Sequence, residues 1–95
     1  MSSFKNMKVI KFGAVWCSGC LVMKPRWKEI EDNNSWLKTE YYDFDSNKEM
    51  VEKYNIDETL PTFIFLDKNE KEFLRLSGEV EKEKLEKILN ENKEK

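Results

Sequence analysis

The stretch GAVWCSGCLVMKP, residues 13–25, holds both cysteines of the chain, Cys17 and Cys20. A strand-like apolar segment, residues 8–14, leads into it, and a helix-like segment, residues 18–32, begins directly after Cys17. The unpaired N–H groups and the positive end of a helix stabilise a thiolate, so this position lowers the pKa of the Cys17 thiol. We therefore expect Cys17 to be the exposed, attacking sulfur. Cys20 should lie one turn along, deeper, and within disulfide-bonding distance.

Three other interpretations of the cysteine pair are possible. A structural disulfide is disfavoured if the chain resides in the cytoplasm, where thiols are kept reduced. Half of a zinc site is disfavoured because the chain has two cysteines and no histidine to complete four ligands. Two ordinary core cysteines would not need this spacing. A Cys-x-x-Cys pair beside a βαβ pattern favours a redox dithiol, which requires no metal ion or organic cofactor.

Outward from this stretch, apolar periodicity predicts four strands and three helices. The strands are residues 8–14, 39–45, 62–67 and 72–77, and the helices are residues 18–32, about 46–54, and one that begins after residue 78. Right-handed crossover makes the first two strands parallel, and the last two form an antiparallel hairpin. The fold class is therefore α/β, a four-stranded mixed sheet in the order βαβαββα with helices on both faces.

Several local features are also predicted. Ser46 and Glu49 form a capping box at the start of the short helix. Pro25 kinks the helix that follows the cysteines, because it lacks an N–H group. Aromatic residues on strand and helix faces, Tyr41 among them, pack in the core. The tail from about residue 90 is expected to fray.

Length and composition limit the class of protein. The 95 residues suit one domain, residues 1–95. A net charge of −2 without a cluster of Lys or Arg argues against a nucleic-acid partner. The longest apolar run is too short for a membrane span, and residues 1–4 lack the apolar stretch of a signal peptide. We therefore expect a cytoplasmic protein with no membrane partner, and a monomer.

Three motifs together resemble the thioredoxin family. They are FGAVWCSGC with Pro25 in the following helix, TLPTF before the third strand, and the Ser77-Gly78 pair. The resemblance extends from residue 8 to about residue 89. The chain lacks the additional N-terminal strand and helix of a full-length thioredoxin, so it resembles the minimal version of that fold.

The resemblance implies roles for four residues around the cysteines. Trp16 matches the tryptophan that shapes the rim of the site. Pro61 matches the cis-proline that packs beside the cysteine pair. The backbone of Leu60 would pair with an extended substrate strand, and Gly78 matches the glycine that lets a substrate backbone approach closely.

The chain departs from the family pattern at three places. Lys11 stands where the family usually has a buried aspartate that relays a proton of the second cysteine. Three behaviours of Lys11 are possible. A neutral amine could shuttle that proton, and a charged amine would favour thiolates. Alternatively, the stem of the side chain packs in the sheet while the ammonium group reaches solvent. Ser18 and Gly19 replace the usual Gly-Pro, which loosens the active-site turn and predicts a more oxidising protein. Gly13 replaces a residue that is often aromatic, which would open space beside the site.

The activity implied by the resemblance is thiol–disulfide oxidation and reduction. The main hypothesis is a reductase of disulfide-containing proteins that receives electrons from a thioredoxin reductase or from glutathione. A glutaredoxin-like protein dependent on glutathione is the first alternative, although WCSGC is less typical of that site. A non-catalytic binding module with the same fold is the second alternative, and the two intact cysteines argue against it.

Overall fold

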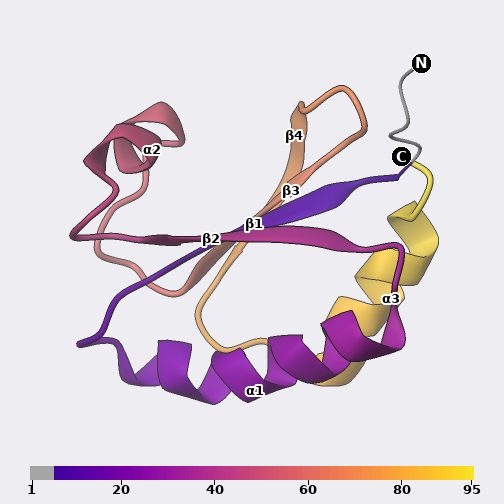
Figure 1. Ribbon diagram of the computed structural model, residues 1–95, viewed down its shortest axis with the longest axis horizontal. Coiled ribbons are helices and arrows are strands. Elements are labelled where there is room, and N and C mark those ends of the chain that lie inside the picture. The colour runs from indigo at the N-terminus through magenta and orange to yellow at the C-terminus, as the bar shows by residue number, and fades with distance from the viewer. Residues whose placement is uncertain (1–5) are drawn as a thin grey trace.

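The computed structural model describes residues 6–95, which form four strands and three helices in the predicted order (Figure 1). The elements are β1 (Lys8–Gly13), α1 (Ser18–Asn33), β2 (Lys38–Asp43), α2 (Lys48–Lys53), β3 (Thr62–Leu66), β4 (Glu72–Ser77) and α3 (Lys82–Asn92). The prediction about a signal peptide concerns residues 1–4, which lie outside the described residues. None of the helices in residues 6–95 is both long enough and apolar enough to cross a lipid bilayer.

The four strands form one mixed sheet in the order β2-β1-β3-β4. β1 pairs parallel with β2, and β3 pairs antiparallel with β4, as the sequence predicts. β3 also pairs antiparallel with β1, a contact that the sequence does not predict. Every residue of β3 and most residues of β1 are buried, because these central strands are covered on both faces. β2 and β4 are the edge strands and are only partly buried.

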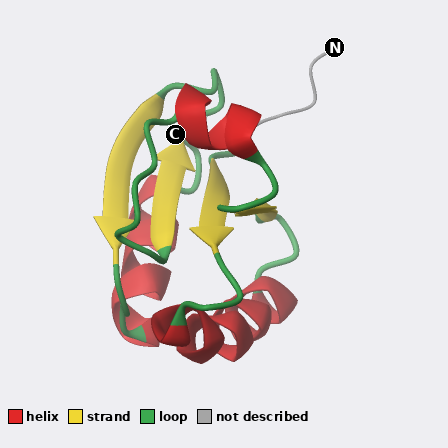
Figure 2. Cartoon of the chain, turned by 90° about the vertical axis from the view of Figure 1, so that its left-hand side faces the viewer, coloured by secondary structure: helices red, strands yellow, loops and turns green. Residues whose placement is uncertain are grey.

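Helices cover both faces of this sheet, which confirms the predicted architecture (Figure 2). α1 and α3 pack on one face around a core cluster of Met7, Val9, Met23, Trp27, Ile30, Phe63, Phe65, Val80, Leu85 and Leu89. α2 lies on the other face beside a smaller cluster of Ile10, Phe12, Ile56, Ile64 and Leu66. Burying each large apolar side chain stabilises the fold by about 1.5–3 kcal/mol, so these two clusters hold the helices against the sheet.

The predicted capping box at α2 is wrong. Asn47 is the N-cap residue, and its side chain makes no capping hydrogen bond. Ser46 instead donates its hydroxyl to the Asp43 carboxylate at 2.9 Å, and the backbone N–H groups of Asp45 and Ser46 donate to the same oxygen. The carboxylate at the end of β2 therefore organises the turn and holds the Ser46 hydroxyl away from the helix.

Tyr41 is not a core residue, because it lies on the edge strand β2 and is 57% exposed. The aromatic residues of the central strands, Phe12 of β1 and Phe63 and Phe65 of β3, are buried as expected. Trp27 of α1 packs on Phe63 with ring centroids 5.4 Å apart. α1 continues through Pro25 to Asn33. The exposure of Tyr41 matters for the site described below.

The two ends of the described chain meet at the start of β1. The sequence predicts a frayed tail, but α3 continues to Asn92, and the carbonyl of Lys93 accepts the N–H of Met7 at 3.1 Å. The N–H of Lys68 donates to the carbonyl of Lys95 at 3.3 Å. These ends lie opposite the junction of β1 and α1, where the cysteines are (Figure 1).

Candidate active site

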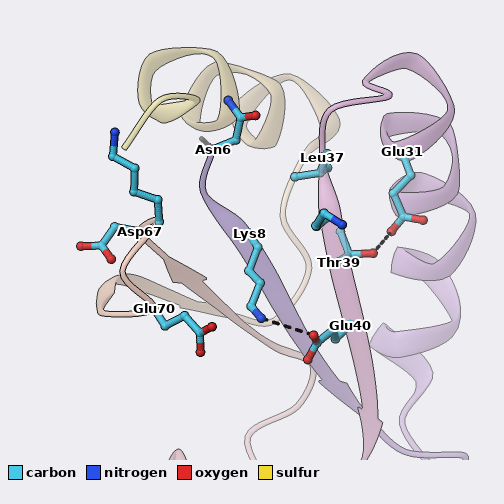
Figure 3. A pocket seen from close by; sticks show the side chains of 10 residues that line it. Asn6, Lys8, Glu31, Leu37, Thr39, Glu40, Asp67 and Glu70 are labelled. Atoms are coloured by element: carbon cyan, nitrogen blue, oxygen red, sulfur yellow. Dashed lines mark hydrogen bonds and ion pairs between the residues drawn. The ribbon is translucent and has the colours of Figure 1, made fainter. Parts of the chain in front are cut away.

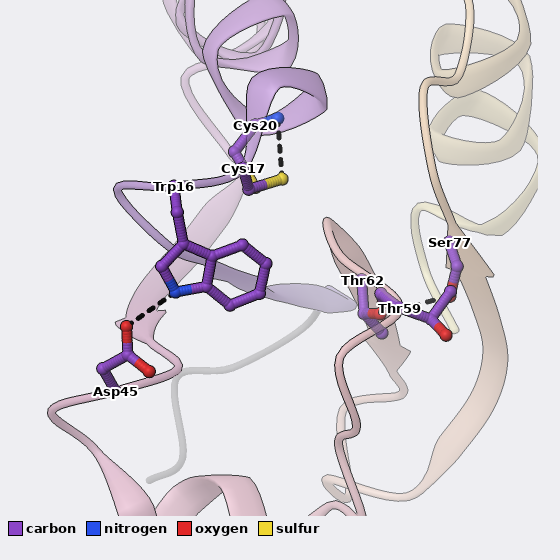
Figure 4. Close-up of a disulfide and its surroundings, with 7 residues drawn as sticks. All are labelled: Trp16, Cys17, Cys20, Asp45, Thr59, Thr62 and Ser77. Carbon is purple, nitrogen blue, oxygen red and sulfur yellow. Dashed lines mark hydrogen bonds between the residues drawn. A yellow bond between two sulfur atoms is a disulfide. The ribbon is translucent and has the colours of Figure 1, made fainter.

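Cys17 and Cys20 form a disulfide at the junction of β1 and α1, with their Cα atoms 5.3 Å apart. Cys17 is the N-cap residue of α1 and has extended backbone angles. The N–H of Cys20 donates to the sulfur of Cys17 at 3.1 Å (Figure 4). The sulfur therefore lies at the amide end of the helix, where a thiolate would accept the same N–H and interact with the helix dipole.

The exposure of the two cysteines is the reverse of the prediction. Cys17 is only 6% exposed, whereas Cys20 is half-buried. The reason is the N-cap geometry, which turns the Cys17 side chain back over the first turn of α1. The N–H of Cys17 also donates to the carbonyl of Ala14 at 3.2 Å, which holds the backbone close to the end of β1.

Trp16 lies at the rim of this site, as the resemblance implies. Its indole N–H donates to the Asp45 carboxylate at 2.8 Å (Figure 4). Its ring meets Phe44 edge-on with centroids 6.2 Å apart. The side chain nevertheless remains 53% exposed, and Val15 and Leu21 are exposed nearby in the chain. An anchored aromatic ring with exposed apolar neighbours is a surface on which an apolar part of a substrate can pack.

Pro61 lies beside the active-site turn formed by Ser18 and Gly19. The Leu60–Pro61 peptide bond is cis, which confirms the implied geometry. A methyl group added at Gly19 would lie 3.2 Å from the Cδ atom of Pro61. The carbonyl of Pro61 accepts the N–H of Gly78 at 2.7 Å, so the loop before β3 and the end of β4 meet next to the cysteines.

Gly78 adopts a φ angle of +86°, which side chains of L-amino acids rarely allow. A methyl group added there would meet no atom within 4 Å, so the space above this residue is open. Leu60, which precedes the cis bond, is half-buried. The backbone that the resemblance assigns to substrate binding thus borders open space beside the disulfide.

Lys11 directs its amine away from the cysteines. Its Nζ atom lies 2.6 Å from a carboxylate oxygen of Glu31 and 5.6 Å from the centre of the Trp27 ring, and its side chain is 17% exposed. Glu31 follows Cys20 by about three helical turns, or about 16 Å along α1. Glu31 also accepts the Thr39 hydroxyl at 2.9 Å (Figure 3). Of the three predicted behaviours, a packed stem with an outward amine fits best, although the amine meets a carboxylate.

The space expected beside Gly13 is not open. A methyl group there would lie 2.9 Å from the Tyr41 hydroxyl and 3.1 Å from the Cys20 sulfur. A cavity of about 440 Å³ continues from this point, and its lining includes Cys20, Tyr41, Lys11 and Lys24. Sequence reasoning missed Tyr41 because it assigned that side chain to the core. The alternation along β2, which places residues 39, 41 and 43 on the face toward α1, would have indicated it.

A second cavity, of about 480 Å³, lies at the far end of the sheet (Figure 3). Its charged lining residues include Lys8 and Glu40, which form an ion pair at 3.3 Å. Chiefly the hydrogen bond from Tyr42, and then the charge of Lys8, lower the pKa of Glu40, although burial opposes them. Within residues 6–95 no group of three or more His, Cys, Asp or Glu side chains is placed to hold a metal ion.

Comparisons with known proteins agree with this geometry. The thioredoxin family model matches residues 2–91. Thioredoxin-1 of Caenorhabditis elegans is 32% identical over 81 residues, which cover 85% of this chain and 69% of that protein. The thioredoxin of Ovis aries is 30% identical over 90 residues, which cover 95% of this chain and 83% of that protein.

Solved structures show the same similarity. The crystal structure of a thioredoxin from Nicotiana alata superposes with a TM-score of 0.84 and 26% identity, covering 95% of this chain and 76% of that one. The matching fold, the cis-proline and the Cys17–Cys20 disulfide at the start of α1 all agree with the family's site. The chain therefore belongs to the thioredoxin family and is a thiol–disulfide oxidoreductase with Cys17 and Cys20 as its redox pair.

Proposed function

We propose that the protein reduces disulfide bonds in other proteins, with Cys17 as the attacking sulfur and Cys20 as the resolving sulfur. The observation that carries this proposal is the position of Cys17. Its sulfur accepts the N–H of Cys20 at the positive end of α1, and the two sulfurs are bonded. A thiolate at this position is stabilised, and its partner is in reach.

The reaction follows from this arrangement in two exchanges. The Cys17 thiolate attacks one sulfur of the substrate disulfide, that disulfide breaks, and the other substrate sulfur leaves as a thiolate that takes a proton from water. Cys20 then loses its proton to water and attacks the Cys17 sulfur of the mixed disulfide. The second substrate thiolate leaves, and two electrons have passed from the dithiol to the substrate.

The surroundings of the pair support a polypeptide substrate. Trp16 offers an anchored aromatic surface, and the cis peptide of Pro61 and the open space over Gly78 lie on the other side of the sulfurs. An extended substrate chain could lie along Leu60 by strand addition. After each turnover a thioredoxin reductase or glutathione would restore the dithiol, and a cytoplasmic location would favour this direction.

An insulin-reduction assay tests the proposal. The protein should precipitate insulin chains with NADPH and thioredoxin reductase, or with glutathione and glutathione reductase, and the more effective donor distinguishes a thioredoxin-like from a glutaredoxin-like enzyme. Cys17→Ser should abolish turnover, whereas Cys20→Ser should accumulate a mixed disulfide that is visible on a non-reducing gel and disappears on a reducing gel.

The matched control is Ser35→Ala, which keeps both sulfurs and changes an exposed serine just after the far end of α1. This variant should retain turnover. If the protein, reduced chemically beforehand, fails to transfer electrons to insulin at all, the reductase proposal is wrong and a binding module is favoured.

A further inference from the structure

The resolving step of the proposed function requires Cys20 to become a thiolate, and the structure restricts which group can assist. The chain has no histidine. Lys11, which stands at the family's aspartate position, has its amine 2.6 Å from Glu31, about three helical turns from Cys20. The inference below rests on the proposed function, because it concerns the second sulfur of that reaction.

Tyr41 is the polar side chain that the fold brings next to Cys20. A methyl group at Gly13 would lie 2.9 Å from the Tyr41 hydroxyl and 3.1 Å from the Cys20 sulfur. Adding these distances shows that the oxygen and the sulfur are at most about 6 Å apart, a span that one water molecule bridges. The absence of a side chain at Gly13 is what allows this approach.

The Tyr41 hydroxyl is available as a donor. Within residues 6–95 it makes no hydrogen bond to another protein group. Burial, and then the negative charge of Asp43, raise the pKa of Tyr41 above its ordinary value of 10.0. The phenol therefore keeps its proton at neutral pH, so it can donate a hydrogen bond but cannot act as a general base.

Other charged groups face the same space. Lys11 of β1 pairs in register with Tyr41, and Lys24 of α1 lines the same cavity. Asp43 lies on the same face of β2 as Tyr41. Lys24 favours an anion at Cys20 and Asp43 opposes it, while the Lys11 charge is paired with Glu31. The Tyr41 hydroxyl is the one of these groups whose distance from the sulfur is bounded, at about 6 Å.

We propose that the Tyr41 hydroxyl donates a hydrogen bond, directly or through one water molecule, to the Cys20 thiolate of the mixed disulfide. The Cys20 proton leaves to water, Tyr41 keeps its own proton, and the stabilised thiolate attacks Cys17. Tyr41 relays no proton, unlike the acidic group that the family usually provides from β1, and it stabilises the Cys20 thiolate from the neighbouring strand, β2.

A thiol-exchange experiment with 5,5′-dithiobis(2-nitrobenzoate) tests this inference on the intact, reduced protein. Attack by Cys17 releases the first coloured thiolate in a phase that depends on reagent concentration. Attack by Cys20 on the mixed disulfide releases the second in a phase that does not. Stopped-flow absorbance over a range of pH therefore reports Cys20 separately from Cys17.

The informative variant is Tyr41→Phe, which removes only the hydroxyl. The second phase should slow by about three- to tenfold at neutral pH, and its pH midpoint should rise, because a hydrogen bond to a charged group is lost. The first phase should be unchanged. Tyr42→Phe is the matched control, since Tyr42 points to the opposite face of β2 and donates to Glu40, so both phases should follow the wild type.

Two results would overturn the inference. The first is that the second phase of Tyr41→Phe keeps the rate and the pH profile of the wild type. The other is that this phase is slower by the same factor at every pH and its pH midpoint is unchanged, which would indicate a structural role of Tyr41. If Cys17 fails to attack the reagent, the proposed function fails. Tyr41 is then tested in Cys17→Ala by the pH dependence of Cys20 alkylation with iodoacetamide, whose midpoint should rise on adding Tyr41→Phe. Normal exchange without insulin reduction would contradict only the proposed function.

Discussion

At the scale of single residues, the site depends on a few positions where one side chain, or none, is required. Gly78 has a backbone conformation that favours glycine, and Gly13 leaves room for the Tyr41 hydroxyl beside Cys20. Lys11 has its amine beside Glu31. Each of these features can be changed separately, because Gly78 follows the end of β4, and Lys11 and Gly13 are two different positions of β1.

Gly78→Ala should lower the free energy of unfolding by about 1–2 kcal/mol, because a Cβ atom strains a left-handed backbone. No clash contributes, since the space above Gly78 is open. Urea unfolding followed by circular dichroism measures the loss. Glu79→Ala, at the exposed residue that follows, should change the stability by less than about 0.5 kcal/mol. Equal stability of Gly78→Ala and the wild type would show that this φ angle is not maintained in solution.

Lys11→Met should leave the midpoint of the ultraviolet titration of the Cys17 thiolate within about 0.3 pH unit of the wild type. The reason is that the Lys11 charge is paired with Glu31, and salt screens the remaining interaction of this charge with the sulfur. Lys28→Met, on the exposed side of α1, provides the comparison. An upward shift specific to Lys11→Met would mean that the amine turns toward the sulfurs when the disulfide is reduced.

Single residues were predictable where a motif fixes them and unpredictable where a distant neighbour does. The proximity of the two cysteines follows from their spacing, and the cis-proline follows from the resemblance to the family. The orientation of Lys11 depends on Glu31, which lies twenty residues away in the chain. The exposure of Tyr41 depends on β2 being an edge strand, and the burial of Cys17 depends on how its side chain folds over α1.

At the scale of elements, the starts of the two long helices differ in how they are capped. Cys17 caps α1 with a sulfur that also carries the chemistry. Glu81 occupies the N-cap of α3 with suitable extended backbone angles, but its side chain makes no capping hydrogen bond. A residue that caps the first turn of α3 with its side chain should therefore stabilise the fold without any change to the site.

Glu81→Asp should raise the free energy of unfolding by about 0.5–1 kcal/mol, because the shorter carboxylate can accept an N–H group of the first turn while the charge is kept. Denaturant midpoints measured at neutral pH would show the gain. Glu83→Asp, inside the same first turn, should give no gain, because aspartate is a poorer helix former than glutamate. Destabilisation by Glu81→Asp would indicate that the longer side chain has a role in packing.

Apolar periodicity predicts the existence and chain order of the elements, because it reports burial directly. The pairing of β1 with β2 and of β3 with β4 could also be predicted, but the antiparallel pairing of β1 with β3 could not. β3 is an almost continuous apolar run, β1 is mostly apolar apart from Lys8 and Lys11, and both strands are central. The start of α2 could not be predicted as well. The Ser46 and Glu49 pattern competes there with the Asp43 carboxylate, which takes the Ser46 hydroxyl.

At the scale of the whole molecule, two carboxylates on the edge strands, Glu40 of β2 and Glu72 of β4, make the free energy of unfolding depend on pH. The hydrogen bond from Arg75, and then its charge, lower the pKa of Glu72 against the effect of burial. The pKa of Glu40 is lowered mainly by Tyr42. A carboxyl group with a lowered folded pKa binds fewer protons in the folded state. Its contribution is therefore present above the unfolded pKa and lost as the pH falls through the folded pKa.

The urea midpoint should therefore fall as the pH decreases below the ordinary glutamate pKa of 4.5. Glu72→Gln should reduce the stability at neutral pH and flatten this acid dependence, because the variant has no carboxylate to protonate and loses the paired contacts with Arg75. Glu58→Gln, at an exposed loop position, should retain the wild-type slope. Parallel curves for Glu72→Gln and the wild type would assign the acid sensitivity to other groups.

The backbone contact between Met7 and Lys93 has a practical consequence. It brings two segments that are far apart in the sequence together at the start of β1, at the end of the sheet opposite the disulfide. A bead, an electrode or a neighbouring module tethered at this end would leave the redox face unobstructed. A short peptide bridge from Lys93 to Met7 could also close the backbone into a ring, and the ring could then be reopened in the loop between β3 and β4.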